Sequence, residues 1–177
     1  MRGTADWLSS ASQATSYLLG GLVVALALAA YATSMSLTEI AAWAHNVLGV
    51  TFALLLGALV FVTLLAWVKI TQLRQDDDTY QAWLTTGVQA ANGVATLALT
   101  YTLLGISLGI GGLAGKELTP ETIQGIIQGL TGNFSMAFMT TVIGLPASAL
   151  LRGLLLVTDA RAQSVAVAAP QPKGSEP

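Results

Sequence analysis

Four long apolar runs dominate this chain, and each is close to the length that crosses a lipid bilayer. They cover residues 17–33, 47–68, 88–112 and 134–157. A transmembrane helix needs roughly 20 apolar residues, because about 30 Å of hydrocarbon is crossed at 1.5 Å per residue. The fourth run contains Arg152, near enough to its end for the guanidinium to reach the lipid headgroups. The runs predict an all-α, polytopic membrane protein with four transmembrane helices.

The composition excludes several classes of function. Of the residues, 54% are hydrophobic and only 9% are charged, whereas about a quarter are charged in soluble domains. The net charge of -2 gives no basis for nucleic-acid binding. With no cysteine and one histidine, thiolate chemistry is excluded and a metal site is not expected. The chain has no nucleophile–base constellation, so neither an enzyme nor a cofactor is expected.

The positive charges predict an orientation. Residues 34–46 and 113–133 form the two loops on one side of the membrane, and they hold a single cation, Lys116. The other six cations lie on the other side, at or beyond the opposite ends of the apolar runs. The positive-inside rule therefore places both termini in the cytoplasm. We divide the chain into a cytoplasmic segment 1–16, a transmembrane domain 17–158 and a tail 159–177. The tail is small, polar and proline-bearing, and we expect it to be disordered.

A further helix is expected before the fourth run. Thr119 is a suitable N-cap and Pro120 suits the first helical position. We expect this helix to run along the outer surface of the membrane. Two courses stay open beyond it: the helix continues into the fourth span, or it breaks first at Gly129, Gly132 or Asn133.

Two short motifs leave alternatives open. The aspartate run Asp76–Asp78 suits a solvated turn, with docking of a cytoplasmic partner as the alternative. The sequence Ala30-Tyr31-Ala32 fits a small-x-small cleavage pattern. Cleavage there would leave three spans without changing the orientation of the remainder.

The last two spans carry hydroxyls but no acidic residue. Thr102 and Thr141 lie about 10 and 7 residues from the outer ends of their spans, hence within roughly 5 Å of each other in height. Threonine in a membrane helix also commonly bonds its own backbone or a neighbouring helix. Pro146 frees a backbone carbonyl and is expected to kink the fourth span. The small residues that share a helical face with each threonine are Ala98, Gly105 and Gly109 with Thr102, and Ala137, Gly144 and Ser148 with Thr141.

Both narrow faces suit an inserted helix better than lipid, and the segments that carry them resemble a known family. The segments are YTLLGISLGIGGLA at 101–114 and MAFMTTVIGLPA at 136–147, and they are similar to the last two helices of the MotA/TolQ/ExbB proton-channel family. The resemblance places Thr102 and Thr141 on the threonines that face the ion path. Gly105 and Gly144 are the glycines that follow those threonines.

The resemblance implies an assembly. It implies a homopentameric ring around a dimer of a single-span MotB/ExbD/TolR-like protein, which supplies an ion-binding Asp from within the membrane. The transported ion would be H⁺ or Na⁺, and the location would be the bacterial inner membrane. The motor would couple ion-motive force to mechanical work in the cell envelope.

The resemblance is confined to residues 93–152, and the chain departs from it in two ways. Pro146 directly follows Leu145, earlier than in many family members. The cytoplasmic segment between the second and third spans is reduced to residues 70–86, which argues against flagellar torque. Two alternatives stay open: a non-conducting membrane scaffold or assembly protein, and a small homo-oligomeric channel.

Overall fold

The chain folds into four long helices, as the apolar runs predict. The computed structural model describes residues 2–33, 36, 38–40, 42, 49–73, 78–113 and 119–168. All of the regular secondary structure in these residues is helical, and four of the helices are long and apolar enough to cross a membrane. The helices are α1 (Arg2–Thr33), α3 (Val50–Gln72), α4 (Asp78–Gly111) and α5 (Pro120–Ala168).

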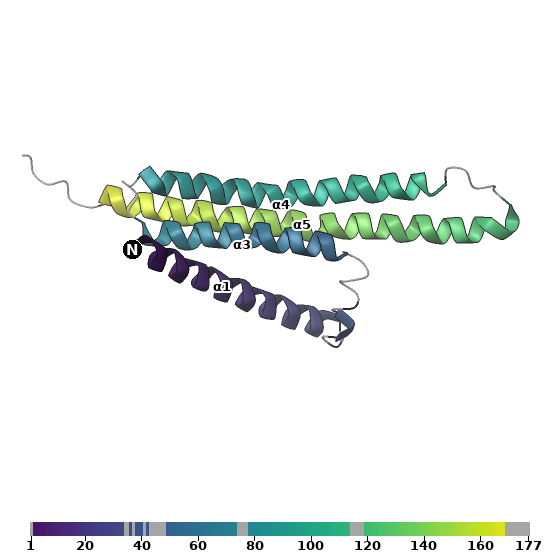
Figure 1. Cartoon of the computed structure of the whole chain (residues 1–177), viewed down its shortest axis with the longest axis horizontal. Coiled ribbons are helices and arrows are strands. Elements are labelled where there is room, and N and C mark those ends of the chain that lie inside the picture. Colours follow the sequence, from purple (N-terminus) through teal and green to yellow (C-terminus); the bar gives the residue numbers. More distant parts are fainter. Residues whose placement is uncertain are drawn as a thin grey trace, which may run out of the picture.

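The helices alternate in direction, and the N-terminal end of α1 and the C-terminal end of α5 lie at the same end of the molecule (Figure 1). The antiparallel pair α4–α5 forms the most extensive contact between elements, and α3 packs against both of its members. The helix α1 contacts only α3 among the described elements. The architecture is therefore a paired centre, α4–α5, with α3 and then α1 laid on one side.

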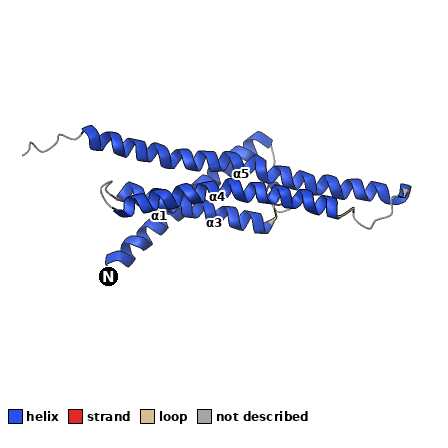
Figure 2. Cartoon of the chain, turned by 90° about the horizontal axis from the view of Figure 1, so that it is seen from above, coloured by secondary structure: helices blue, strands red, loops and turns tan. Residues whose placement is uncertain are grey.

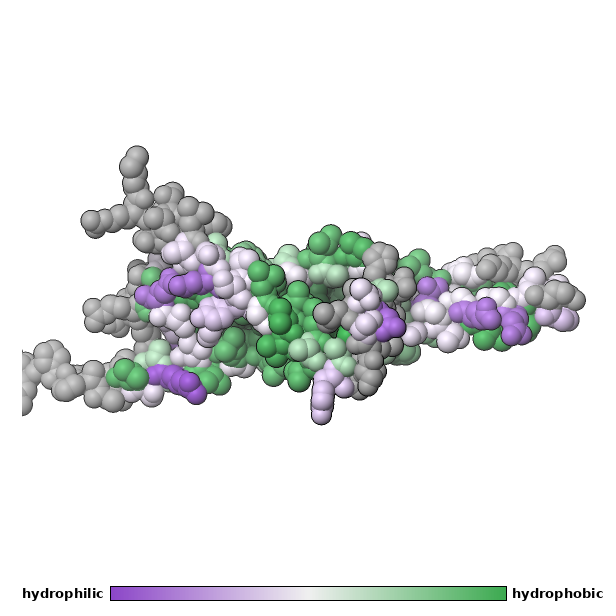
Figure 3. Space-filling view, turned by 90° about the horizontal axis from the view of Figure 1, so that it is seen from below, coloured by the Kyte–Doolittle hydropathy of each residue, from purple (hydrophilic) through white to green (hydrophobic). Residues whose placement is uncertain are grey.

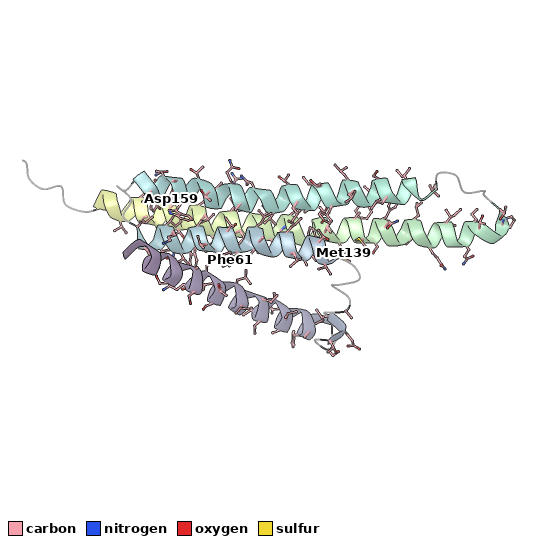
Figure 4. All side chains as sticks on the ribbon, viewed as in Figure 1. Phe61, Met139 and Asp159 are labelled. Carbon is pink, nitrogen blue, oxygen red and sulfur yellow. The ribbon has the colours of Figure 1, made fainter. Side chains whose placement is uncertain are left out.

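A compact core ties α3, α4 and α5 together at the end where the termini lie. Ile70, Tyr80 and Leu155 are buried there, one from each helix. The hydroxyl of Tyr80 donates to Oδ1 of Asp159 at 2.9 Å, and Figure 4 labels Asp159 at this end. The indole N–H of Trp67 donates to the hydroxyl of Thr158 at 3.0 Å. Amphipathic aromatic side chains with a polar partner are typical of a membrane–water interface.

A smaller contact attaches α1. Ala14 is buried against α3, and the rings of Tyr17 and Trp67 meet edge to face with centroids 5.1 Å apart. The hydroxyl of Ser10 donates to the side-chain carbonyl of Gln72 at 2.9 Å. Beyond these residues α1 diverges from the bundle (Figure 1), and its apolar side chains are exposed, among them Val23 and Leu28.

A band of hydrophobic surface crosses the middle of the molecule, between more hydrophilic residues toward both ends (Figure 3). Many more of the large apolar side chains on the helices are exposed than are buried. Lipid covers such surface in a membrane protein, so the exposure is consistent with the four candidate spans. The chain is a multi-pass membrane protein.

The pair α4–α5 extends well beyond α3 at the end away from the termini (Figures 1 and 2). Phe52, in the first turn of α3, packs edge to face on Tyr101 of α4 with ring centroids 5.1 Å apart. From Tyr101, α4 continues to Gly111, a further 15 Å at 1.5 Å per residue. The hairpin therefore projects past the level where α3 begins.

The start of α5 agrees with the prediction, whereas its predicted course along the membrane surface needs correction. The helix begins at Pro120 and, of the two courses left open, it takes the continuous one, through Gly129, Gly132 and Asn133 to Ala168. Its first turns lie in line with the span and project beyond the end of α4 (Figure 1). Further along, α5 packs on α4: a Cβ built on Gly109 would lie 2.8 Å from the Phe134 ring.

The tail was expected to be disordered from residue 159, yet α5 remains helical to Ala168. The segment is rich in alanine, the strongest helix former, and the side chain of Gln163 donates to Asp159 at 2.9 Å, one turn away. The predicted N-terminal segment 1–16 is also helical from Arg2. Of the aspartate run, only Asp78 is described, as the first residue of α4. Asp76, Asp77 and residues 169–177 lie outside the described residues.

Candidate functional site

A cluster of three threonine hydroxyls lies between α4 and α5. The hydroxyls of Thr102 and Thr141 are in hydrogen-bond contact across the two helices. Thr102 Oγ1 also lies 2.9 Å from the carbonyl oxygens of Ala98 and Ala137. Thr140 is fully buried and donates to Ala137 O at 2.7 Å. The predicted common height of Thr102 and Thr141 is therefore confirmed at the level of direct contact.

The cluster holds fewer donor hydrogens than acceptor positions. Each hydroxyl carries one donor hydrogen and two acceptor lone pairs. Thr102 has two carbonyl acceptors and two neighbouring hydroxyls within reach, so it can donate to only one of them at a time. Such a cluster can rearrange its donors without breaking the fold, and its oxygens can accept a hydrogen bond or coordinate a cation.

The six small residues assigned to the threonine faces form the contact between α4 and α5. The approach is close enough that added atoms would collide. A Cβ built on Gly105 would lie 2.7 Å from Cβ of Ala137, and one built on Gly144 would lie 2.4 Å from Cβ of Ala98. Ser148 donates to Ala91 O at 2.7 Å. Ala98, Ala137, Gly105, Gly109, Gly144 and Ser148 are all buried in this contact.

Thr102 and Thr141 lie at the edge of that contact, on the side turned away from α3. Thr102 follows Tyr101, which packs on α3 through Phe52, and one residue turns the direction by about 100° around the helix. Both threonines are partly exposed, whereas Thr140 is buried. The hydroxyls of Thr102 and Thr141 are thus within reach of a group that approaches the α4–α5 pair from the side opposite α3.

Pro146 lies inside α5 without ending the helix. Its ring nitrogen has no hydrogen, so the carbonyl of Val142 lacks its usual donor four residues on. Both residues are exposed. The predicted free carbonyl is a consequence of the helix continuing through the proline, and it lies on the outer face of α5.

Two carboxamides on α4, Gln89 and Asn92, were not among the predicted site residues. The prediction rested on hydroxyls and ionisable groups within the spans, whereas these amides lie inside the predicted run 88–112. Neither side chain makes a hydrogen bond to any residue that the structure describes. Gln89 is exposed and Asn92 is partly exposed. Their polar character within an apolar run was the signal that would have identified them.

Among the described residues, no group of three or more His, Asp or Glu side chains is placed to hold a metal ion. His45 lies outside the described residues. No family model, no curated protein and no solved structure matches this chain.

Proposed function

We propose that this chain is the ion-conducting subunit of a MotA/TolQ/ExbB-type motor in the bacterial inner membrane. Five copies form a ring around a dimer of a single-span MotB/ExbD/TolR-like protein. The ring and the dimer convert the flow of H⁺ or Na⁺ into mechanical work in the cell envelope.

The observation that carries the proposal is the paired hydroxyls of Thr102 and Thr141. They meet across α4 and α5, at the edge turned away from α3, within two spans whose centres hold no charged residue. A helix inserted against this edge would meet oxygen ligands at one depth from every copy of the ring. An ion that passes between the ring and the inserted helix needs such ligands where water is excluded.

The ionisable group has to come from the partner. Ion-coupled transport across a membrane generally uses an ionisable side chain within the bilayer, and the four apolar runs of this chain carry only Arg152, near the inner end of the run 134–157. An aspartate on a partner helix at the level of Thr102 would complete the path. The hydroxyls would then solvate the ion, and the carboxylate would bind and release it.

The shape of the bundle favours work done on the outer side. The connection between α3 and α4 spans only residues 73–77, so little of the chain can engage a cytoplasmic rotor. The α4–α5 hairpin instead projects beyond α3 at the opposite end (Figure 2). A partner whose outer part reaches into the envelope is the arrangement that this shape serves.

A second candidate is a non-conducting membrane scaffold or assembly protein, and one observation favours it. The small residues of the two threonine faces are fully used in packing α4 on α5, and Thr102 has backbone acceptors within its own chain. Close packing through small residues is a general device of membrane helices. A scaffold needs the contact but not the flux.

The experiment that tests the proposal is a subunit count on the detergent-purified chain, by native mass spectrometry and by image averaging of single particles. A ring of five, with or without a central pair of foreign helices, supports the motor. A monomer, dimer or tetramer overturns it and leaves the threonines as packing residues.

A further inference from the structure

A stripe of polar side chains follows α4 through its apolar run, on the side turned away from both α3 and α5. We call it the α4 polar stripe. Contacts to α5 and α3 are made by residues on the other side of the helix, such as Gly87, which lies against Ala66 and Leu155. The stripe recurs at helical spacing, and all of its members are exposed except the half-exposed Asn92. It comprises Thr85, Gln89, Asn92, Thr96, Thr100 and Ser107.

The centre of the stripe lies at the centre of the membrane. A Cβ on Gly93 would lie 3.2 Å from the side chain of Leu59, and Leu59 is halfway between Val50 and Val68, the ends of the charge-free part of α3. Asn92 is therefore level with the middle of that span. Thr96 and Thr100 donate to backbone carbonyls of α4 at 3.2 Å and 2.8 Å, so their hydroxyls are satisfied within the helix.

The two carboxamides of the stripe are not satisfied. Gln89 and Asn92 have no hydrogen-bond partner among the described residues, and hydrocarbon offers neither donors nor acceptors to them. Uncovered amides at this depth are costly, and asparagine and glutamine in membrane helices characteristically bond to another helix. The stripe therefore requires a protein neighbour that the described part of the chain does not provide.

A complementary face lies on the opposite side of the pair, on α5. Pro146, Ala149 and Gly153 all point away from α4, and a Cβ on Gly153 would meet nothing within 4 Å. These residues are small or ring-closed, so they leave the α5 backbone accessible. The freed carbonyl of Val142 lies one turn before Pro146. We call Pro146, Ala149 and Gly153 the α5 small face.

The stripe and the small face lie at the same depth. Ser148 donates to Ala91 O, which in antiparallel helices places the adjacent Ala149 level with Asn92 to within about two residue rises, or roughly 3 Å. Two further contacts extend this register: Gly144 lies against Ala98, and Gly87 against Leu155. By the same register, Gly153 is level with Gln89, and Pro146 is level with Thr96.

We propose that the α4 polar stripe of one copy packs on the α5 small face of the next copy, so that Asn92 and Gln89 bond the exposed α5 backbone across the interface. Two different faces on opposite sides of one chain make a head-to-tail contact, which closes into a ring when the rotation allows. When copies are related by an axis along the membrane normal, equivalent residues lie at one depth in every copy. Two faces that meet in such a ring must therefore lie at the same depth, as the α4 polar stripe and the α5 small face do. The proposal rests on the self-assembly in the proposed function but not on its ion flow.

The contact sets the geometry of the ring. In this ring, helices α4 and α5 of successive copies alternate around the central axis. The Thr102–Thr141 edge faces the axis, and α3 and α1 lie on the outside of the ring. With five copies, ten helices at an interaxial distance of about 9 Å place their axes roughly 15 Å from the centre. Subtracting a helix radius of about 5 Å leaves a lumen roughly 10 Å in radius, which accommodates two helices side by side.

The test is cysteine cross-linking between differently tagged copies in membranes, which is direct because the native chain has no cysteine. One copy carries Asn92→Cys and the other Ala149→Cys. Val24→Cys is the matched control, since Val24 is exposed on α1 and lies at about the same depth, by the Tyr17–Trp67 contact. We expect oxidation to link Asn92→Cys to Ala149→Cys and not to Val24→Cys. Linking of Asn92→Cys to itself, equal linking to the control, or no linking overturns the interface.

A second measurement uses variants that leave the single copy intact. Asn92→Leu removes the amide, and Gly153→Leu fills the small face where nothing in the same chain is displaced. Each should weaken assembly roughly five- to thirty-fold, the range for one hydrogen bond between membrane helices in model peptides, and Asn92→Gln should restore part of it. Assembly of Asn92→Leu at the native affinity overturns the proposal. A ring of five without the Asn92–Ala149 link would overturn only this proposed interface. A monomeric chain would overturn both the interface and the proposed motor function.

Discussion

Replacing Gly144 with alanine should destabilise the α4–α5 pair although it adds a single methyl group. The new Cβ would lie 2.4 Å from Cβ of Ala98 and 3.5 Å from the carbonyl oxygen of Val94. Ordinary contact between carbon atoms is about 3.5–4.0 Å, so the helices must separate locally by about 1 Å. The carbonyl contact is already acceptable, and the collision is therefore with Ala98 alone.

The separation has a calculable cost. Overpacking of this kind costs about 1–3 kcal/mol. It also stretches the Ser148–Ala91 and Thr102–Ala137 hydrogen bonds, each worth about 0.6 kcal/mol between membrane helices. Alanine recovers about 1 kcal/mol of helix propensity relative to glycine. The net loss should be roughly 1–3 kcal/mol of unfolding free energy.

The assay is equilibrium unfolding by dodecyl sulfate in mixed micelles, followed by circular dichroism. Gly132→Ala is the matched control on the same helix, since a Cβ there meets nothing within 4 Å, and it should be neutral or slightly stabilising. Adding Ala98→Gly to Gly144→Ala removes the colliding atom and should restore the stability. If Gly144→Ala unfolds like Gly132→Ala, the close approach of the two helices at this point is wrong.

Three further outcomes are expected. Thr141→Val keeps the shape but removes the hydroxyl, so ion flux into inverted membrane vesicles should fall at least about tenfold, the loss of one stabilising hydrogen bond, while the subunit count is unchanged; native flux would remove Thr141 from the ion path. Gly105→Leu starts from a Cβ 2.7 Å from that of Ala137, so size-exclusion chromatography should show no normal assembly, and recovery of a native ring would contradict the packing. The pKa of Glu39 is lowered chiefly by the backbone N–H of Ser36, and also by its hydroxyl. Because the folded pKa is the lower one, this contact holds at neutral pH and is lost as the pH falls through the lowered pKa. Ser36→Ala removes only the hydroxyl, so carboxyl NMR titration should show the pKa moving part of the way back up, and an unchanged value would refute the contribution of the hydroxyl.

The positions of the helices could be predicted from the sequence because hydrocarbon thickness fixes the length of an apolar run. The same holds for the height of Thr102 against Thr141, since antiparallel helices joined by a hairpin share a register. The continuity of α5 was not predictable from local signals. Gly129, Gly132 and Asn133 weaken an isolated helix, but α4 packs on α5 at the end of this stretch, where Gly109 lies against Asn133 and Phe134, a tertiary effect that propensity does not contain.

The sequence also could not predict which neighbouring helix covers the faces of small residues. Helical spacing shows that Ala98, Gly105 and Thr102 share a face, but it does not show what covers that face. In the structure the first two are covered by α5, and only the threonine edge stays open. The outward direction of Asn92 follows from where α3 and α5 pack on α4, which is again information about neighbours and not about spacing.

The uninterrupted course of α5 gives the molecule a mechanical lever. Its 49 residues span about 73 Å at 1.5 Å per residue, and the arm from Pro146 to Pro120 is about 39 Å. Pro146 is the natural pivot, because the missing hydrogen bond softens a helix at that point. A tilt of about 5° there displaces the outer tip by roughly 3 Å. A small displacement of α5 at the depth of Thr102 and Thr141 would thus move its outer tip, outside the membrane, by about the length of an atomic contact.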